Sequence, residues 1–200
     1  MAGPTASLLL KSLLDSEQME MIEHAISMIS STSKSEGFQV ETTLPIGGTI
    51  REKADAPFGI ALENSGQFED ESMLEEIASL IGYRPVQDFG LFAMRNQDID
   101  HRILGELICY FAERLDCYID FGGAIFSLGL LPKKHRQYFD FVKTEWPDIA
   151  PYFEEMTKDI KGKIFTLGYM TANYKKWASH ICDAEFMRNW LLSPHFHMVK

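Results

Sequence analysis

The stretch Thr5-Ala6-Ser7-Leu8-Leu9-Leu10-Lys11-Ser12-Leu13 stands near the start of this 200-residue chain. It is short and aliphatic, and its apolar and polar residues do not alternate regularly, which fits a central strand more than a helix. The run is interrupted by Lys11 and has no basic region before it, so it is typical of neither a signal peptide nor a membrane span. The stretch therefore predicts a buried strand.

A helix is expected directly after this strand, because Asp15 is a suitable N-cap. The apolar positions that follow recur at helical spacing: Met19, Ile22, Ile26 and Ile29. The polar segment 30–35 predicts a loose connection. Two strands are then predicted, over residues 38–43 and 57–63.

A second helix is predicted over residues 70–81, ending at Gly82. A strand over 86–95 and a helix that begins at Asp98 or Asp100 follow. The apolar stripe of that helix consists of Ile99, Ile103, Leu107, Phe111 and Leu115. Strands over 117–121 and 124–128 would flank Gly122-Gly123, which predicts a tight hairpin.

The rest of the chain predicts a helix after Pro132 that ends at Pro147, and a second helix over residues 149–160. A strand over 163–171 and a helical tail over 174–192 complete the expected order.

This order predicts an α+β fold with a mostly antiparallel or mixed sheet and helices packed on one face, because hairpin-linked strands disfavour a purely parallel sheet. The pattern strand, helix, strand, strand, helix occurs twice, and this suggests two related units. We expect a single domain over residues 1–200, with sub-lobes 5–82 and 86–200 as an alternative.

The negative charge lies almost wholly in the first half of the chain. Residues 1–100 contain 17 Asp and Glu against 6 Lys and Arg, whereas residues 101–200 contain 12 against 13. An acidic surface repels phosphate backbones, so direct nucleic-acid binding is not expected. The asymmetry indicates a surface that faces a protein partner.

The densest acidic cluster is the candidate binding site for that partner. Helix capping explains some of these carboxylates but not all of them. The candidate residues are Glu63, Glu69, Asp70, Glu71, Glu75 and Glu76. They would attract a basic toxin or nuclease domain and block it, so the leading hypothesis is a non-enzymatic, immunity-type inhibitor.

The alternative is a metal-binding protein or a hydrolase-like enzyme that uses a C-terminal group. If the chain after Pro194 is extended, His195 and His197 share a face and could bind zinc. His180 or Asp183 would complete such a site. The competing interpretation is a solvated edge strand, which the alternating Phe196 and Met198 favour.

A second metal alternative involves Asp98, Asp100 and His101, although acidic residues at this position are expected from helix capping. No phosphate-binding loop, nucleophile elbow or zinc-protease motif is present.

The string from His180 to Lys200, together with Tyr118-Ile119-Asp120-Phe121-Gly122-Gly123-Ala124, resembles a family of uncharacterised, mainly bacterial proteins of about this length. The resemblance covers nearly the whole chain and implies no catalytic or binding residue. In size and acidity the chain is also similar in type to bacterial immunity proteins, which inhibit toxin domains in the cytosol.

Three isolated cysteines suit a reducing compartment, so a cytoplasmic location is expected, with no membrane partner and no cofactor. A third hypothesis is a structural homo-oligomer. In that case the acidic half of one copy would contact Lys133, Lys134 and Arg136 of another.

Overall fold

The computed structural model describes residues 3–34, 37–64, 71–125 and 144–199 of the chain. These residues form one eight-stranded antiparallel sheet in the order β2-β3-β4-β5-β1-β6-β8-β7, together with five α-helices. The predicted α+β class with an antiparallel sheet is confirmed.

The bounds of the elements follow the chain. The strands are β1 Thr5–Leu10, β2 Ser30–Lys34, β3 Gly37–Val40, β4 Phe58–Asn64, β5 Gln87–Ala93, β6 Tyr118–Asp120, β7 Ile164–Met170 and β8 Lys176–Cys182. The α-helices are α1 Ser16–Ile29, α2 Glu71–Ile81, α3 Asp98–Leu115, α5 Trp146–Thr157 and α6 Ala184–Leu191, and a short 3₁₀ helix, η1, spans Leu44–Ile46.

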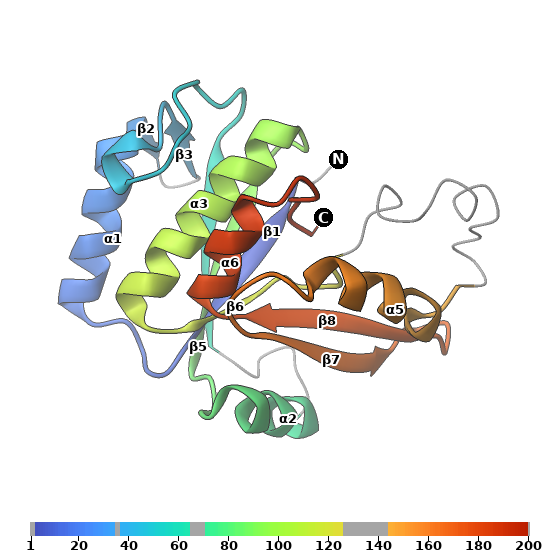
Figure 1. Ribbon diagram of the computed structural model, residues 1–200. Coiled ribbons are helices and arrows are strands. Elements are labelled where there is room, and N and C mark those ends of the chain that lie inside the picture. Colours follow the sequence, from blue (N-terminus) through green and yellow to red (C-terminus); the bar gives the residue numbers. More distant parts are fainter. Residues whose placement is uncertain (1–2, 35–36, 65–70, 126–143, 200) are drawn as a thin grey trace.

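Strand β1 is central, as the sequence predicts. It pairs with β5 along all six of its residues and with β6 on its other side. A strand of the first predicted unit therefore lies between two strands of the second predicted unit. Residues of both predicted repeat units consequently share one sheet (Figure 1).

Successive residues of β1 enter two different apolar clusters, because side chains alternate across a sheet. Leu8 and Leu10 pack in the larger cluster with residues of α1, α3, α5 and α6, whereas Leu9 packs in a smaller one with Ile77 and Ile81 of α2. Four described helices thus cover one face, and α2 alone covers part of the other (Figure 1). We call this second face the α2 side.

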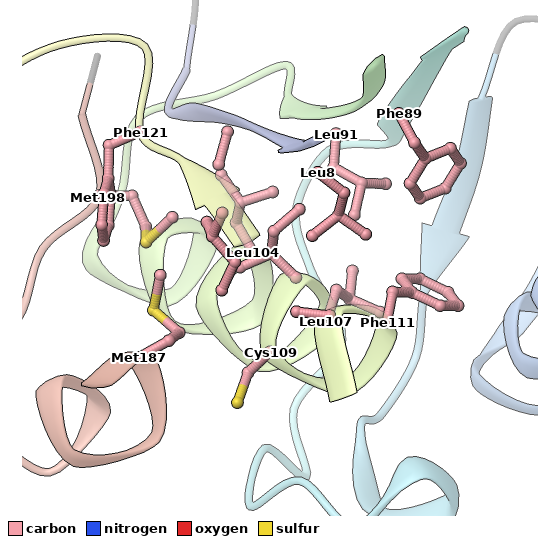
Figure 2. Close-up of a cluster of buried hydrophobic side chains, with 14 of the residues drawn as sticks. Leu8, Phe89, Leu91, Leu104, Leu107, Cys109, Phe111, Phe121, Met187 and Met198 are labelled. Atoms are coloured by element: carbon pink, nitrogen blue, oxygen red, sulfur yellow. The ribbon is translucent and has the colours of Figure 1, made fainter. Parts of the chain in front are cut away.

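The larger cluster is built around α3, whose buried side chains meet the strands. Figure 2 shows Leu8 and Leu91 facing Leu104 and Leu107 of the helix, with Phe111 near Phe89. The Phe89 and Phe111 rings meet edge to face, with their centroids 5.6 Å apart. Aromatic pairs favour this geometry, so the helix is fixed against the sheet in one position.

Helix ends are set by local sequence. Asp15 accepts a hydrogen bond from the backbone N–H of Gln18 at 2.8 Å, and the Gln18 side chain accepts one from Asp15, which completes a capping box at α1. Helix α2 ends before Gly82, whose φ of 84° only glycine adopts readily. The predicted start of α1 and the predicted end of α2 are confirmed.

The predicted hairpin around Gly122-Gly123 is wrong. Both edges of β6 are already occupied, by β1 and by β8, so no third strand can pair there. Ala124 and Ile125 are not in a strand, and residues 126–128 lie outside the described residues. The helix predicted after Pro132 also lies largely outside them, and Trp146 begins α5 rather than ending a helix.

The predicted helical tail over 174–192 is half wrong, because residues 176–182 form β8 and only α6 is helical. The segment 30–35, predicted to be loose, contains the strand β2. Both errors have one cause. Neither segment has a clean period of two, and pairing with β7 or β3 decides their conformation.

The position of β1 makes a stability prediction. Leu8 is fully buried, whereas Leu13, just beyond the strand, is 58% exposed. Leu8→Ala should lower the free energy of unfolding by about 3 kcal/mol, because it leaves a cavity in the core. The control Leu13→Ala should stay within about 0.5 kcal/mol. Urea denaturation measures both, and equal losses would contradict a buried central β1.

Candidate functional site

The α2 side of the sheet carries acidic residues in register. Glu63 of β4 lies opposite Asp88 of β5, and Asp88 lies opposite Leu9 of β1. Leu9, Asp88 and Glu63 therefore form one row across three strands, and α2 covers the Leu9 end of this row. The register therefore places two carboxylates next to each other on this side of the sheet.

Helix α2 adds three exposed carboxylates to the same side. Its apolar residues Leu74, Ile77 and Ile81 are buried, while Glu71, Glu75 and Glu76 are exposed. Arg84 forms a two-pronged ion pair with Glu71, one arm at 2.7 Å, and this contact lowers the pKa of the Glu71 carboxyl. Glu75 and Glu76 carry no such pair among the described residues.

We call Glu63, Asp88, Glu71, Glu75 and Glu76 the α2-side acidic surface. Four of these five residues are among the candidates from the sequence. The other two candidates, Glu69 and Asp70, lie outside the described residues. The structure therefore places the described candidates on one side of the sheet.

Other acidic residues of the first half lie elsewhere. Glu17, Glu20 and Glu23 are exposed on α1, which packs against the opposite face of the sheet. Figure 1 shows α1 and α2 well separated. The acidic half therefore presents two separate acidic helices.

The cations of the first half are largely used in local ion pairs. Lys53 pairs with Glu41, Arg95 with Asp55, and Arg84 with Glu71. Lys11 pairs with Asp116. These pairs are exposed and contribute little to stability. Glu75 and Glu76 of α2 and the three exposed carboxylates of α1 are in none of these pairs, so they contribute to the excess negative charge of this half.

Asp120 of β6 is a further carboxylate on the α2 side, and the sequence analysis did not single it out. It lies opposite Ser7 and accepts hydrogen bonds from the Gly122 N–H at 2.8 Å and the Ser179 hydroxyl at 3.2 Å. Burial raises the pKa of this carboxyl, and the two donors only partly offset that effect. Asp88 was missed as well. Its position beside Glu63 depends on the pairing of β4 with β5, which the sequence does not show.

His180, a candidate metal ligand, lies in the core. Its ring stacks on Phe153 at 4.1 Å between centroids and meets Trp146 edge to face at 5.0 Å. Its Nδ1 accepts a hydrogen bond from the Ile125 N–H at 3.0 Å, so the proton of the neutral ring is on Nε2. Burial lowers the pKa of this imidazole to about 3. The side chain is a neutral core residue around neutral pH.

The other three metal candidates have separate roles. Asp183 caps α6 by accepting a hydrogen bond from the Phe186 N–H at 2.8 Å. His195 is exposed, and His197 packs edge to face on Trp190 at 5.8 Å. Within the described residues, no three His, Cys, Asp or Glu side chains gather at metal-binding spacing.

His101 fastens the C-terminal segment to α3. Its Nδ1 accepts a hydrogen bond from the Met198 N–H at 2.9 Å, and its Nε2 lies 3.0 Å from the Asn96 side-chain oxygen. Burial and the nearby His197 lower the pKa of His101. Asp100, in the same group, accepts from the Gln97 N–H in a capping box. The capping interpretation is confirmed for Asp100.

The cysteines are all free and buried. Burial raises the pKa of the Cys109 and Cys117 thiols to about 12, and it raises that of Cys182 well above its ordinary value. A protonated thiol is a weak nucleophile. The basic residues Lys133, Lys134 and Arg136 of the oligomer hypothesis lie outside the described residues.

Comparison with known proteins gives a family but no activity. A family model described as a family of unknown function, DUF6368, matches residues 2–200. The chain belongs to the DUF6368 family. This confirms the resemblance to an uncharacterised family over nearly the full length. No curated protein and no solved structure matches the chain.

In the described part of the chain, every helix is too short or too polar to cross a lipid bilayer.

His180 makes a pH prediction. Because its pKa is about 3 in the folded protein and about 6.5 in an unfolded chain, the unfolded state binds the proton more tightly. Stability is full above pH 6.5 and falls as the pH drops toward 3. His180 should account for about 2 kcal/mol of lost unfolding free energy between pH 7 and pH 5.

Urea denaturation at both pH values tests this, with His180→Gln as the variant. The control is His24→Gln, since His24 is exposed on α1. In the control, the unfolding free energy should fall between pH 7 and pH 5 as much as in the wild type. In His180→Gln that fall should be about 2 kcal/mol smaller, even if this variant is less stable than the wild type at pH 7. An unchanged pH dependence in His180→Gln would show that this imidazole is not held neutral.

Proposed function

We propose that this DUF6368 protein is a non-enzymatic binding module that docks a basic protein on its α2-side acidic surface. The observation that carries the proposal is the row of Glu63 and Asp88 beside the acidic helix α2. Carboxylates gathered on one side of the sheet attract the lysine and arginine side chains of a basic partner.

The surface suits recognition for a second reason. It lies on a strand pair and a helix that are fixed by buried residues, so its carboxylates are held in place before binding. Phe89 of β5 and Ile77 of α2 provide this anchoring from the two apolar clusters. A preorganised surface loses little conformational freedom on association.

The partner class that fits best is a basic toxin or nuclease domain, blocked sterically in the manner of an immunity protein. Charge complementarity supports this choice, because such domains carry lysine and arginine for phosphate contacts. We place the protein in the cytoplasm, where three free buried thiols are stable.

Metal binding is less well supported. His180 stacks in the core, Asp183 caps a helix, and no three potential ligands gather among the described residues.

The test pairs two charge-reversal variants of equal charge change. Glu75→Lys/Glu76→Lys alters the α2-side acidic surface, and Glu20→Lys/Glu23→Lys alters α1 on the opposite side. Wild-type protein is used to capture binders from lysate of the source cells. The association rate of the purified partner is then measured by stopped-flow with each variant.

The α2 variant should slow association about tenfold or more at 0.1 M salt, and the α1 variant should change it less than about threefold. Raising the salt to 1 M should slow the wild type too, because the screening length falls from about 10 Å to about 3 Å. Capture of no basic protein, or equal effects of the two variants, would refute the proposal.

A further inference from the structure

The two edges of the sheet differ. The edge strand β2 contains only polar residues in sequence, and a bulge interrupts its pairing with β3 between Ser30 and Thr32. The other edge strand, β7, reads Ile164-Phe165-Thr166-Leu167-Gly168-Tyr169-Met170 and pairs with β8 over seven residues without a break. Proteins blunt sheet edges with bulges, prolines or charges within the strand. Strand β7 has none of these.

The register shows which backbone groups of β7 face outward. Just before β7, the Lys163 carbonyl accepts a hydrogen bond from the Asp183 N–H. Just after β7, the Thr171 N–H donates one to the Lys175 carbonyl, in the turn before β8. In an antiparallel pair, hydrogen-bonded residues alternate with residues that point away. Thr166 and Gly168 therefore direct their N–H and C=O groups outward. Both are exposed, and no described strand pairs with them.

We propose that β7 pairs antiparallel with β7 of a second copy, across a two-fold axis at Leu167. This register is the one that pairs all seven residues. It places Thr166 opposite Gly168 of the second copy as a hydrogen-bonded pair, and likewise Ile164 opposite Met170.

The side chains of the strand are complementary to themselves in this register. Phe165 meets Tyr169 of the second copy on the α2 side, and aromatic cross-strand pairs stabilise a sheet. Met170, which is 56% exposed in the single chain, is covered by Ile164 of the second copy. Gly168 has open space where a Cβ would lie on the face of the sheet, so alanine fits there without a clash within the chain.

Charge opposes the pairing of two copies, and this repulsion sets the salt dependence of the dimer. Lys161 and Lys163 precede the strand and Lys176 begins β8, and all three are exposed. Pairing two copies brings these lysines closer together. It also keeps both α2 helices on one side of the joined sheet, because the two-fold axis is perpendicular to it. The dimer should therefore tighten as salt rises.

Sedimentation equilibrium of the full chain tests the proposal, with a matched pair of variants at Gly168. Gly168→Pro removes an outward N–H that β8 does not use, and edge strands tolerate proline there. Gly168→Ala keeps that N–H and places its Cβ in open space. Thr166→Lys, which puts a charge within the exposed edge, is a second variant, and circular dichroism checks that each variant folds.

The wild type should form a dimer whose dissociation constant falls between 0.05 M and 0.5 M salt. Gly168→Pro and Thr166→Lys should each raise that constant at least about tenfold, since each copy loses a hydrogen bond or gains a repulsion. Gly168→Ala should change it less than about threefold. A wild type that is monomeric at all concentrations overturns the proposal. A dimer that dissociates with salt also overturns it, because that behaviour belongs to contact between acidic and basic surfaces.

Discussion

The structure depends on β1 being buried on both faces while it pairs on both edges. Leu8 and Leu10 anchor the large helical layer, and Leu9 anchors α2 on the opposite side. Backbone pairing to β5 and β6 joins the two halves of the chain through this one strand. Leu8, Leu9 and Leu10 are buried on both faces, which is why this end of the strand lacks the alternation of a half-exposed strand.

This constraint gives the two faces of the sheet different surroundings. Four described helices pack against one face, while α2 is the described helix that covers part of the other. The rows that α2 leaves uncovered can carry polar groups. Glu63 and Asp88 lie there opposite each other, and Asp120 lies in the neighbouring row opposite Ser7. Because α2 buries only part of this side, the acidic residues beside it remain on the surface. The edge strand β7, which lies in the same apolar cluster as α2 through Phe165 and Leu167, borders this side.

Much of the fold was predictable from the sequence, because the deciding signals are local. Asp15 caps α1, Gly82 ends α2, and the apolar stripe of α3 has clear helical spacing. The errors lie in segments whose conformation depends on which strands they pair with. Gly122-Gly123 resembles a hairpin turn, yet β6 has no free edge for a returning strand.

The candidate sites show the same division between local and long-range signals. Glu63, Glu71, Glu75 and Glu76 could be identified from charge density alone. Asp88 could not, because its position opposite Glu63 depends on the pairing of β4 with β5. His180 and His197 could be noticed as imidazoles near one another in sequence. Only the fold shows that one stacks on Phe153 and the other on Trp190.

Hydrogen–deuterium exchange of the protein alone and in complex with its captured partner tests whether a basic protein docks on the α2 side. We expect slower exchange on binding in residues 58–64, 71–81 and 87–93, with no change in residues 16–29. Protection confined to residues 16–29 would instead place the binding site on α1 and refute docking on the α2 side.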